Sequence, residues 1–432
     1  MDGNDRRIVG VAMLAHAMVH TYELSVPIFV GYWLDGFGTT EAAVGVAVTV
    51  GYGAFGAGAL PGGVLADLVG SRRLIAVCLL GMGGAFLVLS QATGLVTVTL
   101  ALLLWGVAAS VYHPSGLSLI STGVRDRGSG FAYHGMAGNF GIAVGPLVTS
   151  LLLIALDWQT VAAALALPAL VAAAVAAWVD VDETAAVDAA ETTADGGPET
   201  TTADGATGSG GETADGRAES VASLGAFLDG TRALFTGAFA VVLLVVIASG
   251  LYYRGVLTFL PEILASFPSF DPVEVAGVEL EPARYAYVGL LGVGMVGQYA
   301  GGRLTERLYP PTGLAAGFGV LAVLAVVFVP ALGFGVAGFL TVGILLGVAL
   351  FVVQPLYQAT VAELTPPGTR GLSYGYTYLG VFGVGALGGG VAGVVLTRAD
   401  EVALFGLLAL VAAIGSVAGA HLSRRRASSS VS

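Results

Sequence analysis

Apolar residues are gathered into long runs that short polar segments separate. Each run is close to the roughly 20 residues that a helix needs to cross a bilayer. The first run is too long for a cleaved signal peptide, contains Glu23 and is followed by further runs. The pattern predicts twelve transmembrane helices, at residues 8–33, 42–66, 74–92, 95–121, 131–155, 159–179, 237–264, 285–305, 312–333, 335–361, 374–396 and 402–421.

One polar segment, residues 180–220, divides the runs six to six. It is made of Ala, Thr, Gly, Asp and Glu with almost no large apolar residue, so we expect it to be disordered. Apolar residues at helical spacing follow it and predict a short helix on the membrane surface. The predicted domains are an N-terminal six-helix bundle (1–179), an acidic cytoplasmic linker with that helix (180–236), and a C-terminal six-helix bundle with a cytoplasmic tail (237–432).

The basic residues give an orientation. All 17 are Arg, and 14 of them lie at the two termini or in the even-numbered loops. By the positive-inside rule, both termini are predicted to be cytoplasmic, in a multi-pass protein of the plasma membrane. Only Arg254, Arg284 and Arg398 depart from the rule.

Composition narrows the class of protein. The chain is 56% hydrophobic and only 11% charged, whereas a soluble domain of this length would contain far more charged residues. Its net charge of −12 owes much to the 11 acids of the polar segment, so it does not argue for a nucleic-acid partner. The acidic, lysine-free composition suggests a salt-adapted host. The single cysteine, Cys78, excludes a disulfide framework and is expected to be a packing residue.

A turn motif appears twice. The segments Gly62–Arg73 and Gly301–Arg307 each end an apolar run with a Gly pair, an acid and Arg side chains. Asp67 and Glu306 correspond at an offset of 239 residues. Glycines allow close helix contacts, and the acid suits a helix N-terminus or a neighbouring Arg. Two copies nearly half a chain apart indicate a duplicated membrane protein, which is typical of transporters.

The duplication reaches into the membrane spans. His113-Pro114 corresponds to Gln354-Pro355, and Pro27 in the first span corresponds to Pro261 in the seventh. This match places His20 opposite Arg254. Each half therefore carries a cationic or protonatable side chain seven residues before a helix proline.

Ionisable groups inside the membrane are candidate functional residues, because burying them is costly. His16, His20 and Glu23 share one helical face of the first span, next to Tyr22. A desolvated carboxylate beside His is suited to taking up and releasing a proton, although a purely structural Glu–His pair is the alternative.

Other spans offer further candidate residues. Arg254, after Tyr253, keeps its charge and needs either a carboxylate such as Glu23 or an anionic substrate. Residues at the depth of a transporter cavity complete the predicted substrate and coupling site: His113, His134, Asn139, Gln354, Tyr357 and Gln358. His113 and His134 are equally suited to bonding a helix carbonyl.

These residues together resemble the major facilitator superfamily. Its signature between spans 2 and 3 is met by Gly63, Leu65, Asp67, Gly70, Arg72 and Arg73. The spaced glycines from Gly138 to Gly145-Pro146 look like the span-5 element of its drug exporters. His113-Pro114 and Thr258–Pro261 are similar to the fosmidomycin-resistance-like efflux proteins. Span 4 departs from many proton-coupled exporters, because it has no Arg and His113 is its only ionisable group.

The resemblance implies an all-α membrane protein with two pseudo-symmetric six-helix bundles that work by alternating access. It also implies a cytoplasmic latch between the halves, built from the duplicated turn motif: Gly63, Asp67, Arg72, Arg73, Gly302, Glu306 and Arg307. Simple turn formation is the alternative role for these residues.

The predicted function is export of small organic or drug-like compounds by proton or sodium antiport. Symport uptake of an organic anion or sugar-like solute is the alternative, although such a carrier would want more than one buried Arg. A membrane sensor or enzyme is disfavoured, because no signalling domain, HExxH, Walker loop or Cys/His cluster is present. We expect a monomer in the lipid bilayer with a small-molecule substrate and a coupling ion, without cofactor or metal.

Overall fold

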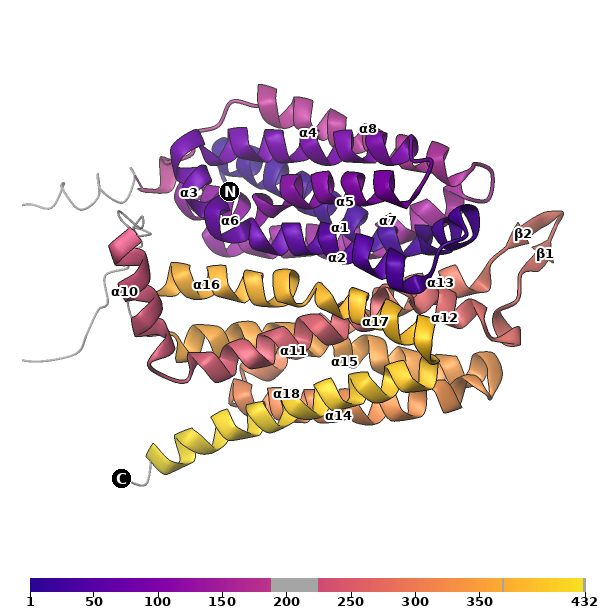
Figure 1. The fold of residues 1–432 in the computed structure, drawn as a ribbon. Helices are drawn as coiled ribbons and strands as arrows, with labels where there is room; N and C mark the ends of the chain where they lie inside the picture. The colour runs from indigo at the N-terminus through magenta and orange to yellow at the C-terminus, as the bar shows by residue number, and fades with distance from the viewer. Residues whose placement is uncertain (188–223, 367–368, 430–432) are drawn as a thin grey trace, which may run out of the picture.

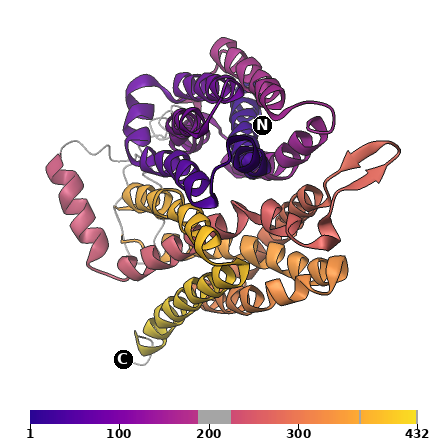
Figure 2. The same cartoon turned by 45° about the vertical axis from the view of Figure 1, so that its right-hand side comes forward.

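The computed structural model describes residues 1–187, 224–366 and 369–429. Residues 188–220 of the segment expected to be disordered lie outside these residues, whereas residues 180–187 are described. The described chain is helical apart from loops and one small hairpin. The two halves lie side by side as separate bundles, and the N-terminus, helix α10 (Leu224–Phe235) and the C-terminus lie at one end (Figures 1 and 2). We call this the terminal end.

The N-terminal half contains six spans, two of them broken. Helices α2 and α3 meet at Gly58 with a bend of 40°, and α5 and α6 meet at Val111, just before Pro114. A proline in the first turn of α6 lacks the N–H that would continue the ladder of α5. The elements are α1 (Gly3–Phe37), α2 (Glu41–Ala57), α3 (Ala59–Val69), α4 (Ser71–Ser90), α5 (Leu95–Ser110), α6 (Tyr112–Gly123), α7 (Arg127–Leu152) and α8 (Trp158–Trp178).

The C-terminal half repeats this plan. Its first span breaks before Pro261, and its fifth contains a π-helical turn, η2. The elements are α11 (Phe239–Leu257), α12 (Leu260–Ala265), α13 (Pro282–Thr305), α14 (Pro310–Leu332), α15 (Gly335–Leu364), α16 (Arg370–Tyr378), η2 (Leu379–Val384), α17 (Leu387–Arg398) and α18 (Glu401–Ser429).

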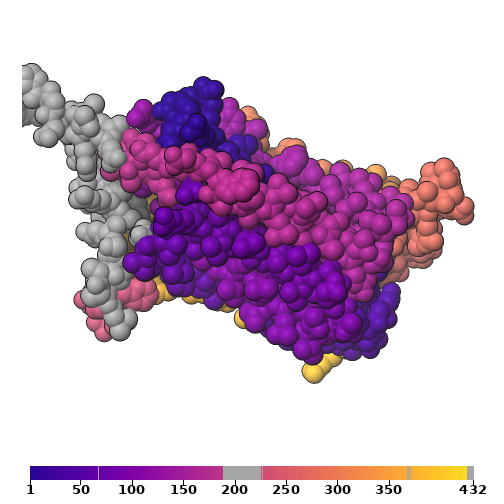
Figure 3. Space-filling model, turned by 90° about the horizontal axis from the view of Figure 1, so that it is seen from above, coloured from indigo at the N-terminus to yellow at the C-terminus, as the bar shows by residue number. Residues whose placement is uncertain are grey.

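A two-stranded antiparallel hairpin marks the other end of the molecule, which we call the hairpin end. Strand β1 (Val273–Val275) pairs with β2 (Val278–Leu280), after the short 3-10 turn η1 (Pro268–Phe270). The turn residues Ala276 and Gly277 both have positive φ, which suits a tight two-residue hairpin. From the side of the N-terminal half, the hairpin projects beyond the bundles (Figure 3).

Nine helical segments of the described residues are long and apolar enough to span a membrane, and the bent α2–α3 pair makes ten. Helices α1 and α13 have 35 and 24 residues and occupy the two remaining predicted spans. In α1, the polar side chains of His16, His20 and Glu23 lower the apolar character of the helix. The prediction of an all-α membrane protein with two six-helix bundles is confirmed.

The halves touch where helix α2 packs on η2 and α17, with main chain against main chain. A Cβ atom at Gly45 would lie 2.8 Å from the carbonyl oxygen of Gly389, and one at Gly56 would overlap the main chain of Gly383. Glycines at these positions allow the two helices to approach more closely than side chains permit. The contact is completed by Thr49, whose hydroxyl donates to the carbonyl oxygen of Ala386 at 3.1 Å.

Candidate functional site

A buried ion pair joins the two halves. The Arg254 guanidinium on α11 pairs with the Glu23 carboxylate near the middle of α1, and the two residues are only 3% and 1% exposed. The sequence left two partners open for Arg254, a carboxylate or an anionic substrate, and the structure places Glu23 there. A buried ion that loses its partner is strongly destabilising, so the pair couples the two bundles energetically.

Neighbouring side chains complete the surroundings of Glu23. His20 Nδ1 lies 2.5 Å from the other carboxylate oxygen, one helical turn away. The Tyr52 hydroxyl donates to the Glu23 main-chain oxygen at 2.5 Å, and the Arg254 guanidinium lies over the Tyr52 ring at 3.6 Å. A face-on aromatic ring attracts a cation. Both carboxylate oxygens thus have a nitrogen partner, and the guanidinium of Arg254 packs on the face of an aromatic ring.

The C-terminal half contributes two more tyrosines. The Tyr287 hydroxyl on α13 donates to the main-chain oxygen of Leu24 at 3.2 Å. The Tyr253 ring lies 5.5 Å from the Arg254 guanidinium. Sequence analysis named Tyr253 but missed Tyr52 and Tyr287. The position of Tyr52, between two glycines in an apolar span, is a signal that would have found it.

Four of the five histidines of the chain meet in the N-terminal half. His16 Nε2 and His20 Nε2 are 3.1 Å apart, and the His16 ring stacks on that of His134 at 3.8 Å between centroids. The His113 ring lies edge-on to His16 at 5.4 Å. The fold thus brings together side chains from three predicted spans.

Glycines of α7 make room for this cluster. A Cβ atom at Gly138 would lie 2.5 Å from the His16 ring, and one at Gly141 would overlap the main chain of Ala17. At Gly145 it would lie 2.6 Å from the Cα atom of Thr21. The spaced glycines of span 5 therefore let α7 lie directly against α1, with the histidine rings between them.

Other predicted site residues lie elsewhere. The Tyr22 hydroxyl donates to the Leu165 carbonyl oxygen on α8 at 2.6 Å, so it packs within the N-terminal half. Gln354 accepts from Gln298 Nε2 at 2.9 Å, between α15 and α13. The remaining three differ in exposure: Tyr357 is buried, Asn139 is half-buried and Gln358 is exposed.

The profile described as Major Facilitator Superfamily matches residues 9–393. The chain belongs to the Major Facilitator Superfamily. It is therefore an integral multi-pass membrane protein and a secondary transporter of small molecules, in a family whose members typically work as monomers.

Solved transporters share the fold of this superfamily member. The nucleoside transporter NupG covers 97% of this chain and 99% of its own, with a TM-score of 0.72 and 14% identity. A bacterial homologue of the human lysosomal transporter Spinster, inward-facing and unoccupied, covers 97% and 98%, with a TM-score of 0.71 and 14% identity. At this identity the likeness establishes the fold and leaves the substrate open.

One relative is similar in sequence over a short stretch. The chain is 41% identical to the puromycin resistance protein pur8 of Streptomyces alboniger over 109 residues. The match covers 24% of this chain and 22% of that protein, so the chain spans about a fifth of the relative's length.

The first copy of the superfamily turn motif connects α3 to α4. The Arg72 guanidinium donates to the carbonyl oxygens of Ala176 and Ala177 at 3.1 and 2.7 Å, at the end of α8 in the same half. Arg73 is exposed, and a Cβ atom at Gly63 would meet nothing within 4 Å. The side chain of Asp67 lies outside the described part of the structure.

The charged side chains of the second copy, at the end of α13, also form their contact within their own half. Arg303 Nη1 pairs with Glu306 Oε2 at 3.3 Å, and both side chains are more than half exposed. Arg307 is exposed, and a Cβ atom at Gly302 would meet open space. Between exposed groups such a pair contributes little to stability.

An acid that sequence analysis did not single out holds the start of α4. Glu183 Oε2 accepts from the main-chain N–H groups of Ser71 and Arg72 at 2.8 and 3.4 Å. Its carbonyl oxygen accepts from the Thr122 hydroxyl at 2.6 Å. A carboxylate is favourable at a helix N-terminus, so the first residues after α8 bind α4 to α6.

We expect Glu183→Ala to lower the thermal unfolding midpoint of the purified protein in detergent. Loss of the carboxylate leaves the first N–H groups of α4 without their acceptor, which costs about 1 kcal/mol. Glu274→Ala on β1, where the glutamate is exposed, is the matched control. Equal melting of the two variants would show that Glu183 does not hold α4.

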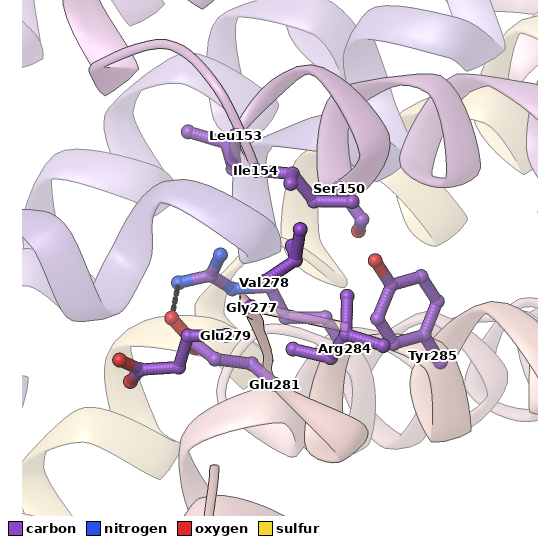
Figure 4. Close-up of a pocket in the computed structure, with 10 residues that line it drawn as sticks. Ser150, Leu153, Ile154, Gly277, Val278, Glu279, Glu281, Arg284 and Tyr285 are labelled. Atoms are coloured by element: carbon purple, nitrogen blue, oxygen red, sulfur yellow. Dashed lines mark hydrogen bonds and ion pairs between the residues drawn. The ribbon is translucent and has the colours of Figure 1, made fainter. Parts of the chain in front are cut away.

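A second polar site lies at the hairpin end. A cavity of about 320 Å³ separates the end of α7 from the hairpin and the start of α13 (Figure 4). On one wall, Arg284 Nη2 pairs with Glu281 Oε1 at 2.5 Å, and the Arg284 guanidinium lies 4.7 Å from the Tyr32 ring of the other half. Partial burial raises the pKa of Glu281, with Glu279 and Asp35 adding to the rise and Arg284 opposing it.

Proposed function

We propose that this superfamily member exports small organic or drug-like compounds by ion-coupled, proton-driven antiport. The observation that carries the proposal is the buried pair of Glu23 and Arg254, one residue from each half, with His20 on the same carboxylate. In alternating access one half rocks against the other. A charge contact across the halves is therefore made or broken as the transporter changes state.

The chemistry of the pair supports a coupling role. Arg254 keeps its charge at any working pH, whereas Glu23 can exchange its charge for a proton. A proton on Glu23 would release Arg254, and a cationic group of a substrate would compete with Arg254 for the carboxylate. Proton entry and substrate exit are then linked through a single side chain.

The similarity to a puromycin resistance protein, although it spans a quarter of this chain, supports a drug-like compound and export. The span-5 glycines that seat α7 on α1 correspond to the drug-exporter element of the sequence. Puromycin is therefore the first compound to test.

We further propose that the terminal end faces the cytoplasm of a plasma-membrane protein. The junction of α3 and α4 lies at this end with the N-terminus and α10 (Figure 1), and Arg72 and Arg73 belong to the first turn of α4. An excess of Arg on one side favours a cytoplasmic location of that side. The hairpin end would then face outwards.

Symport uptake of a small organic anion or sugar-like solute is the second candidate. Arg254 favours it as a buried cation at the seam between the halves, which an anionic substrate could reach by displacing Glu23. The two candidates differ in direction: the exporter moves substrate against an inward proton flow, and the symporter moves both together.

Flux measurements on the purified protein in liposomes test the proposal. A pH gradient or a sodium gradient is imposed, and movement of puromycin and of a panel of organic anions and sugars is followed. Export driven by protons moving in the opposite direction is expected. Movement of substrate in the same direction as the protons would favour the symporter. Transport that depends on sodium alone would show that sodium, and not the proton, is the coupling ion.

A further inference from the structure

The hydrogen bonds of His16 and His20 determine which of their ring nitrogens carry protons. His16 Nδ1 lies 2.7 Å from the main-chain oxygen of His134, and an oxygen of this kind only accepts, so Nδ1 donates. His20 Nδ1 lies 2.5 Å from the Glu23 carboxylate, which also only accepts when it is ionised and paired with Arg254. In the neutral form, each histidine therefore has its proton on Nδ1 and a lone pair on Nε2.

These two lone pairs point at the same place. The Nε2 atoms are 3.1 Å apart, a distance at which one of them would normally donate to the other. With both protons committed elsewhere, two acceptors face each other. Either a third proton or a cation must lie between them.

His113 supplies a third nitrogen. Potential ligand atoms of His16, His20 and His113 all lie within 4.8 Å of one another. In the part of the chain that the structure describes, no hydrogen bond is found for the His113 side chain, whose ring lies beside the rings of His16, His20, Phe55, Tyr112, Tyr378 and Phe382. The nitrogens of His113 are therefore available for a ligand.

We propose that His16, His20 and His113 bind one divalent transition-metal cation of the zinc type. Zinc binds imidazole nitrogen at about 2.0–2.1 Å, which in a tetrahedral site places two ligand nitrogens roughly 3.3 Å apart. The 3.1 Å between the two Nε2 atoms is close to that spacing. Neutral imidazoles suit Zn²⁺, Cu²⁺ or Ni²⁺, whereas Mg²⁺ and Ca²⁺ prefer oxygen ligands.

The groups behind the ligands match what metal sites use. Histidines that bind a metal usually donate their other ring N–H to a carboxylate or a main-chain carbonyl, which fixes the ring. His20 donates to Glu23 and His16 to the His134 carbonyl, so two of the three ligands are held in this way. Sequence analysis expected no metal, because the three histidines lack a local motif and meet only in the fold.

Zinc titration of the intact protein tests the site. The full chain is purified with a tag that contains no histidine, and Zn²⁺ binding is measured at neutral pH by calorimetry. One ion per chain is expected. His16→Gln and His113→Gln are each expected to weaken binding at least about tenfold, because they remove a ligand.

His421→Gln is the matched control, because His421 is the one remaining histidine and is exposed on α18. It should bind zinc as the wild type does. Size-exclusion profiles check that each variant is folded. If a cluster variant fails to fold, the visible spectrum of Co²⁺ bound to the wild type decides, because tetrahedral nitrogen ligation differs from octahedral oxygen ligation.

Two outcomes would overturn the proposal. One is the absence of saturable zinc binding by the wild type, which would mean that a proton alone lies between His16 and His20. The other is binding that His421→Gln removes and His113→Gln leaves unchanged. Neither outcome bears on the transport assay, so the metal site and the proposed export fail or stand separately.

Discussion

Replacing Glu23 by glutamine is expected to abolish gradient-driven transport while substrate binding is largely retained. Glutamine resembles the protonated acid in shape but neither carries a charge nor exchanges a proton. The contact with Arg254 could then no longer alternate between a charged and a protonated state. Substrate accumulation in liposomes under a pH gradient measures the loss, and ligand-induced thermal stabilisation measures the binding that remains.

The buried pair also allows the coupling role to be separated from stability. Glu23→Gln leaves Arg254 buried without its carboxylate, and Arg254→Gln leaves the buried Glu23 with only His20 as a partner. Removing one member of a buried ion pair costs about 3–5 kcal/mol. The double variant leaves neither charge, so we expect it to melt above both single variants and yet to transport no better. If Glu23→Gln still concentrates substrate at the wild-type rate, Glu23 is structural and the coupling group must be sought at His113 or His134.

Gly56→Ala is expected to have the second large effect, a fall in transport of at least about tenfold. A Cβ atom there would overlap the main chain of Gly383 and Phe382 in η2, and main chain cannot move aside as a flexible side chain does. The substitution should therefore exclude the packed arrangement of α2 against η2. A cycle that requires this arrangement would stop.

Gly53→Ala provides a matched control on the same helix, because a Cβ atom there meets nothing within 4 Å. It should transport as the wild type does. Both variants are compared for flux in liposomes and for thermal stability in detergent. Wild-type transport by Gly56→Ala would mean that the packed contact is not part of the working cycle.

The architecture was predictable because a bilayer imposes a length and an apolar character on each span. The breaks within spans were harder to predict, because the breaks at Gly58 and Val111 lie inside continuous apolar runs. The duplication placed His20 opposite Arg254. In the structure the carboxylate of Glu23 lies between them and touches both.

What the sequence could not supply were contacts between distant segments. His113 reaches His16 only because α6 packs beside α1, and Tyr287 reaches Leu24 only because α13 crosses to the other half. Glu183 lies in an acidic stretch whose composition predicted disorder, yet it binds the first N–H groups of α4. Local composition says little about a single side chain that finds a helix terminus.

The glycine contact between α2 and α17 affects how the packing of the two halves depends on salt concentration. In molar salt the Debye length shrinks to about 3 Å, and exposed charges that hold two surfaces together lose most of their attraction. The contacts of Gly45 with Gly389, and of Thr49 with Ala386, involve no charged side chain. The Glu41 carboxylate at the start of α2 accepts from the uncharged Thr397 hydroxyl at 3.0 Å, so this contact is not an ion pair either. This seam should hold equally well in fresh water and in brine, so a host could accumulate salt without changing how firmly its transporter closes there.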